Sequence, residues 1–86
     1  MRNYYEKGDK VKLVLPEESR LSYILKEYSY KDPMGRAIII ENLYTNPQGT
    51  VKAVKEGTGH LEVLYQPKGK THSWWLPTSI IKPLNN

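Results

Sequence analysis

The sequence predicts a mainly-β small barrel of about five strands, with a short helical insert after the first strand. Several short apolar runs are separated by Gly- or Pro-containing turns about every ten residues, as in small all-β domains. One segment near the start has helical rather than alternating periodicity. A chain of 86 residues has enough apolar surface for one core, so we expect a single domain over residues 1–86.

The first strand is expected at residues 11–15, where Val11, Leu13 and Leu15 alternate with Lys12 and Val14. Pro16 ends it, because proline has no N–H to donate to a neighbouring strand. The period then changes to that of a helix, with apolar residues at i, i+3, i+4 and i+7: Leu21, Ile24, Leu25 and Tyr28. We therefore predict the helical insert at about residues 17–29.

A turn and a second strand are expected after this helix. Residues 30–35 contain Asp-Pro and Met-Gly pairs, which are typical of turns. Residues 37–44 include three consecutive isoleucines, and their β-branched side chains favour a strand over a helix. The polar residues 45–49 then form a predicted loop.

The second half of the chain predicts a β-hairpin and a closing strand. Leu61, Val63 and Tyr65 alternate with Glu62 and Leu64, so we expect the first three to face the core. Two glycines in the preceding turn can adopt positive φ. We expect strands at 50–55, 61–65 and 71–76, turns at 56–59 and 66–70, a helical turn at 77–79, and barrel-closing residues at 80–81.

Four short motifs carry a family resemblance: GDKVKLV at 8–14, GTVKAV at 49–54, LEVLY at 61–65 and WWLPTSIIKP at 74–83. In these the chain resembles the SH3-like small barrels of phages and mobile elements of Gram-positive bacteria. In that family a G-x-x-V strand opens the domain, a G-T-V strand follows, and an aromatic residue precedes a Pro-x-x-Ile/Leu closure. The resemblance implies an SH3-like or Tudor-like barrel in a phage or accessory protein. An OB-type barrel is the main alternative.

Charge and composition limit the location and the partners. The net charge is +4, of which residues 43–86 contribute +3, with five lysines against two glutamates. This excess can attract nucleic acid, or it can simply keep a small β domain soluble. There is no cysteine, no apolar run long enough for a membrane helix and no signal-peptide pattern at the N-terminus. We expect a cytoplasmic protein, in the host cytoplasm if phage-encoded, without a membrane partner.

Residues capable of catalysis are sparse. His60, His72 and Glu62 are the only candidates for a metal site, and their number and spacing support one only weakly. Ser73 adjoins His72, but neighbours on a strand point to opposite faces and cannot form a nucleophile–base pair. The Gly-Thr-Gly run at 57–59 lacks the following helix of a phosphate-binding loop. We expect no enzymatic activity, no cofactor and no metal.

Aromatic residues point to binding instead. Trp74 and Trp75 are adjacent on a predicted strand, so one faces the core and the other lies at the surface or beneath the insert. An exposed tryptophan on a basic sheet can bind a nucleobase, a cationic head group or a proline-rich peptide. The predicted partner-binding residues are Trp74, Trp75, Lys52, Lys55, Lys70 and His72. Tyr23 and Tyr30 are a predicted secondary partner surface, since they lie off the main apolar face of the helix.

The sequence thus predicts a non-catalytic module that binds and modulates a protein partner. A nucleic-acid-binding barrel that uses the basic second half is the alternative. The chain has only three arginines, and its lysines are interspersed with glutamates, which favours the protein partner. A small enzyme or ligand-binding protein is the third class, and the oligomeric state is left open.

Overall fold

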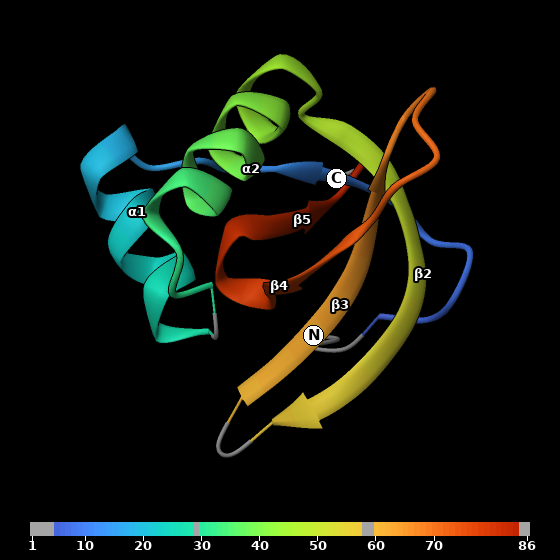
Figure 1. Cartoon of the computed structure of the whole chain (residues 1–86). Helices are drawn as coiled ribbons and strands as arrows, with labels where there is room; N and C mark the ends of the chain where they lie inside the picture. The colour runs from blue at the N-terminus through green and yellow to red at the C-terminus, as the bar shows by residue number, and fades with distance from the viewer. Residues whose placement is uncertain (1–4, 29, 58–59, 85–86) are drawn as a thin grey trace.

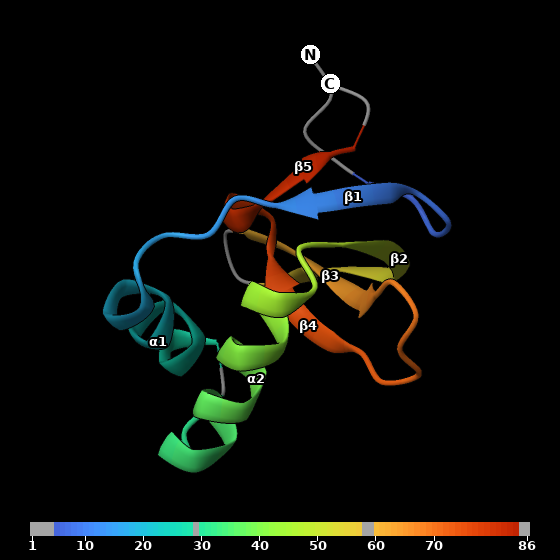
Figure 2. The same ribbon diagram turned by 90° about the horizontal axis from the view of Figure 1, so that it is seen from above.

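A computed structural model describes residues 5–28, 30–57 and 60–84 as a five-stranded antiparallel sheet with two helices packed against it (Figure 1). Seen from above, the two helices lie next to each other on one side of the molecule (Figure 2). Within the described part of the chain, no helix is both long and apolar enough to span a bilayer. The elements in chain order are β1 (Lys10–Leu13), α1 (Glu18–Glu27), α2 (Pro33–Thr45), β2 (Gln48–Gly57), β3 (His60–Pro67), β4 (Trp74–Pro77), the 3₁₀ turn η1 (Thr78–Ile80) and β5 (Ile81–Pro83).

The five strands form one open sheet in the order β4-β3-β2-β1-β5. β2 and β3 make a long hairpin that curves along one side of the molecule in Figure 1, and its register shifts between Val51 and Ala53. β4 and β5 lie at opposite edges of the sheet, although only η1 separates them in sequence. The molecule is therefore a small mainly-β domain with two edge strands.

The predicted closure of a barrel by Ile80 and Ile81 is not seen. Ile81 pairs with Leu13 of β1, which places β5 at the edge away from β4. At the β4 edge, the Tyr30 hydroxyl donates a hydrogen bond to the Trp75 carbonyl over 2.9 Å. A side chain from the connection between α1 and α2, rather than another strand, thus occupies the Trp75 carbonyl at this edge of the sheet.

Residues 37–44, predicted as a strand, belong to helix α2, so that prediction is wrong. Residues 33–35 of the predicted turn are the start of this helix, and residues 30–32 precede it. The Asp32 side chain accepts a hydrogen bond from the Gly35 N–H over 3.1 Å, and Pro33 occupies the first turn. The buried side chains of α2 are Ile39, Ile40 and Leu43. Packing of this face outweighs the modest helix propensity of isoleucine.

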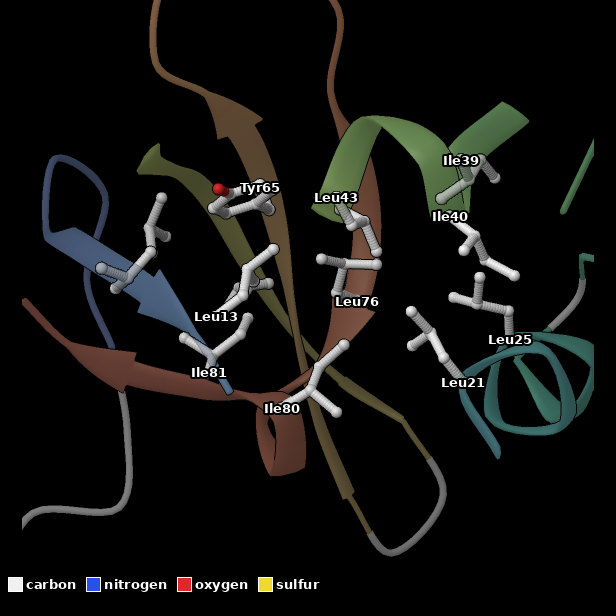
Figure 3. Close-up of a cluster of buried hydrophobic side chains, with 13 residues drawn as sticks. Leu13, Leu21, Leu25, Ile39, Ile40, Leu43, Tyr65, Leu76, Ile80 and Ile81 are labelled. Atoms are coloured by element: carbon white, nitrogen blue, oxygen red, sulfur yellow. The ribbon is translucent and has the colours of Figure 1, made fainter. Parts of the chain in front are cut away.

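Helix α1 confirms the amphipathic helix predicted at about 17–29, with Leu21 and Leu25 fully buried. The insert is nevertheless longer than expected, because α2 follows directly. Both helices, all five strands and η1 contribute side chains to one hydrophobic core. In Figure 3, Leu43 of α2 and Leu76 of β4 lie between the helix side chains and those of the sheet. The core therefore joins the two layers.

A close approach between β2 and β3 requires a glycine at position 49. A Cβ atom there would lie 2.2 Å from the Gln66 carbonyl oxygen and 2.8 Å from the Tyr65 ring. Tyr65 and Val63 are fully buried, which confirms the predicted core face for these two residues, whereas Leu61, also predicted to face the core, is partly exposed and lies outside it. The Tyr65 hydroxyl donates to the Asn46 carbonyl over 2.6 Å, and burial raises the pKa of this phenol. Tyr65 thus anchors the connection between α2 and β2 to the sheet.

The remaining predictions differ mainly in their boundaries. The strand predicted at 71–76 begins only at Trp74, whereas the predicted helical turn at 77–79 is confirmed as η1. The turn predicted at 56–59 includes residues 58 and 59, which lie outside the described residues. The positions on either side of them, Gly57 and His60, are paired across the hairpin.

Candidate functional site

The register between β3 and β4 places the two tryptophans on opposite faces of the sheet. Trp74 lies opposite Tyr65, and it packs, partly buried, against the hydrophobic core. Trp75 lies opposite Leu64, whose neighbours Val63 and Tyr65 are the core-facing residues of β3. Because side chains alternate along a strand, Trp75 belongs to the outer face. The structure therefore identifies Trp75 as the tryptophan that faces away from the core.

Around Trp75 the outer face consists of two cross-strand rows. Ala53, Leu64 and Trp75 form the first row, and Lys55 and Glu62 are partners in the next. The Lys55 Nζ atom lies 4.5 Å from the centroid of the Trp75 ring, a distance at which an ammonium group is attracted to an indole. We call these five residues the Trp75 platform. It combines an apolar row with one positive and one negative side chain.

Tyr30 fixes the backbone of the platform from the edge of β4. Its hydroxyl binds the Trp75 carbonyl, and its ring packs against the core while remaining partly exposed. Burial raises the pKa of the Tyr30 phenol, and the nearby negative charge of Glu62 raises it further. Tyr23, by contrast, is 61 % exposed on α1. Of the predicted secondary surface, Tyr23 is accessible and Tyr30 is held in an intramolecular contact.

The other predicted binding residues do not gather at the platform. His72 lies beside Trp74, with 4.6 Å between their ring centroids. Lys52 is exposed at the register shift in β2. Lys70 is exposed after β3, and its carbonyl accepts a hydrogen bond from the Gln66 side chain. The predicted set thus divides into one Trp–Lys pair, one Trp–His pair and two separate lysines.

The candidate metal ligands cannot be judged as a set, because the His60 side chain lies outside the described part of the structure. Elsewhere in the described chain, no three His, Cys, Asp or Glu side chains gather closely enough to hold a metal ion. The chemistry that the described residues support is therefore noncovalent binding through aromatic, apolar and charged side chains.

Sequence reasoning missed a second surface on the helical insert. Three of the five exposed large apolar side chains in the described residues belong to α2: Met34, Ile38 and Tyr44. The sequence prediction concealed this surface, because it placed Met34 in a turn and assigned Ile38 and Tyr44 to a strand. The sequence signal that could have revealed the helix is Asp32-Pro33, a typical N-cap and first helical residue.

No protein-family model matches the chain, and no match was found to it among curated proteins or solved structures.

Proposed function

We propose that the protein is a non-catalytic binding module that recognises and modulates a protein partner through the Trp75 platform. The observation that carries this proposal is the position of Trp75: a large aromatic side chain lies on the outer face, at the end of an apolar row, with the Lys55 ammonium above its ring. Tryptophan is enriched among the residues that dominate protein interfaces. A strand backbone also holds such a residue more rigidly than a loop does.

The fold is, in this proposal, an SH3-like open barrel. The supporting features are the antiparallel order β4-β3-β2-β1-β5 and the 3₁₀ turn between β4 and β5. Together with the motifs in residues 8–15 and 49–84, they favour an accessory protein of the kind found in phages and mobile elements. The two-helix insert distinguishes this chain from a minimal barrel.

Lys55 places a positive charge beside the apolar row of the platform, and this charge selects the partner. The lysine is exposed, so its contact with the indole contributes about 0.5–1 kcal/mol and is easily exchanged for another. A partner with an apolar side chain next to a carboxylate can pack on Trp75 while its carboxylate pairs with Lys55. Desolvation by the surrounding contacts strengthens that charge pair.

Lys55→Glu tests this proposal at an exposed side chain, and the new carboxylate opposite Glu62 should lower stability by no more than about 1 kcal/mol. The wild-type protein and the variant are immobilised, and the proteins they retain from a host lysate are quantified by mass spectrometry. We expect a specific partner to be retained at least roughly tenfold less by Lys55→Glu and by Trp75→Leu. Lys68→Glu, an equal charge change in the turn after β3, is the matched control. Equal retention by all four proteins would refute the proposal.

A nucleic-acid partner is the second candidate, and the Lys55–Trp75 contact favours it as well. A nucleobase can replace the ammonium on the indole while the lysine turns to a phosphate. Titration with single- and double-stranded oligonucleotides, followed by tryptophan fluorescence, tests this directly. A quench that persists at physiological salt would support nucleic-acid binding, and its salt dependence would count the phosphates neutralised. A quench seen only at low salt would count against it.

A further inference from the structure

Helix α2 has apolar residues on both its buried and its exposed sides. Ile39, Ile40 and Leu43 face the core, yet Met34 and Ile38, four residues apart on the outer side, are 75 % and 57 % exposed. Large apolar side chains that are exposed next to one another often mark a contact surface. The outer side of α2 is therefore suited to contact with another molecule.

Next to this outer side, an open groove of about 600 Å³ runs between α1 and α2. Ala37, Ile40 and Tyr44 of α2 supply apolar atoms to its walls. Glu18 of α1 and Glu41 of α2 contribute one carboxylate from each helix. The groove therefore combines apolar walls on α2 with the hydroxyl groups of Ser19, Ser22 and Thr45, and it carries one carboxylate on each helix.

No basic side chain described as lining the groove balances these carboxylates. Arg36 of α2 reaches the edge of the groove, since its guanidinium binds Ser22, one of the lining residues. It donates to the Ser22 hydroxyl over 3.1 Å and to the Tyr30 and Lys31 carbonyls over 2.8 Å and 2.9 Å. Arg36 thus ties the two helices together through neutral acceptors, and the hydrogen bonds described for its guanidinium do not include Glu18 or Glu41.

We infer that this groove binds a basic amphipathic helix of a partner protein. An amphipathic helix in a groove presents apolar residues at i, i+3 or i+4, and i+7. Such residues would enter between α1 and α2 and contact Ala37 and Tyr44, while flanking lysines or arginines pair with Glu18 and Glu41. Charge complementarity selects a basic helix over an acidic one, since like charges across an interface are strongly unfavourable. This site shares no residue with the Trp75 platform, so the two proposals stand or fall separately.

A displayed library of helical peptides about 14 residues long, close to the length of α2, tests the inference. The flanking positions are randomised, the full-length wild-type protein is the bait, and individual enriched peptides are measured by fluorescence polarisation. We expect enriched peptides to carry net positive charge. Ala37→Lys, which fills the groove at an exposed position, and Glu18→Lys/Glu41→Lys should each weaken their binding at least roughly tenfold.

The control must separate a local from a global charge effect. Glu27→Lys/Glu56→Lys changes the net charge equally at two exposed positions outside the groove, and it should bind the peptides within about twofold of wild type after correction for salt. The inference is overturned if no peptide is enriched, if the enriched peptides are neutral or acidic, or if the control double variant loses as much affinity as the groove variant. It is also overturned if sedimentation shows a wild-type dimer that Ala37→Lys dissociates, because a second copy would then cover the groove.

Discussion

Substitution of Gly49 by alanine tests the tightest contact in the fold. The added Cβ would lie 2.2 Å from the Gln66 carbonyl oxygen, about 1.2 Å short of the 3.4 Å at which ordinary contact begins. The opposing atom belongs to the backbone of β3, so no side-chain rotation can relieve the collision. β2 and β3 must separate where Gly49 pairs with Pro67 and Thr50 with Gln66.

The expected loss of stability is the sum of two contributions. Overpacking of a tight site costs about 1–3 kcal/mol, and weakening one or two adjacent ladder hydrogen bonds adds about 0.5–1.5 kcal/mol each. We therefore expect Gly49→Ala to lower the free energy of unfolding by about 3 kcal/mol. For a domain of this size that corresponds to a fall in Tm of about 12–24 °C. Urea denaturation and thermal melts followed by circular dichroism measure both quantities.

Two further variants decide whether the backbone collision is the cause. Gly69 has φ +79°, and a Cβ added there would have no other atom within 4 Å, so Gly69→Ala reports backbone strain alone, about 1–2 kcal/mol. Gly49→Ala/Tyr65→Leu removes the ring contact but keeps the carbonyl contact, so it should still be less stable than Tyr65→Leu alone. A loss below about 1 kcal/mol in Gly49→Ala, or equal stability of the double variant and Tyr65→Leu, would refute the reasoning.

Three other predictions concern a helix cap, a buried phenol and the platform. Asp32→Ala should lower the unfolding free energy by about 1 kcal/mol in urea denaturation, because the Gly35 N–H loses its acceptor. Asp32→Asn should retain most of the stability. An equal loss in both variants would contradict a capping role. The pKa of Tyr65 is raised in the folded protein, so this phenol ionises in the unfolded chain first. Its contribution to the free energy of unfolding is therefore fully present below about pH 10 and is lost progressively as the pH rises above about 10. Urea denaturation from pH 8 to 11 should therefore show a steeper loss of stability for wild type than for Tyr65→Phe, and parallel profiles would exclude this linkage. Lys55→Met should lower the unfolding free energy by no more than about 1 kcal/mol, and a larger loss would mean that the lysine is structural rather than available to a partner.

Local sequence patterns predicted the elements whose determinants lie within one segment. The i, i+3, i+4 spacing of Leu21, Ile24 and Leu25 was sufficient to predict α1, and the alternation along β3 placed Val63 and Tyr65 in the core. Proline and glycine residues predicted where several of the helices and strands end. The same logic failed at residues 37–44, because β-branched isoleucines favour a strand locally, whereas their packing in the core and the Asp32 cap favour a helix.

The sequence by itself determined that Trp74 and Trp75 must face opposite ways, because successive side chains on any strand do so. It could not determine which of the two side chains faces away from the core. That depends on the register between β3 and β4, which places Trp74 opposite the buried Tyr65 and Trp75 opposite Leu64. The open sheet and the groove between α1 and α2 were likewise decided by tertiary structure: the sheet pairs strands that are far apart in the chain, and the groove depends on how two consecutive helices pack against each other.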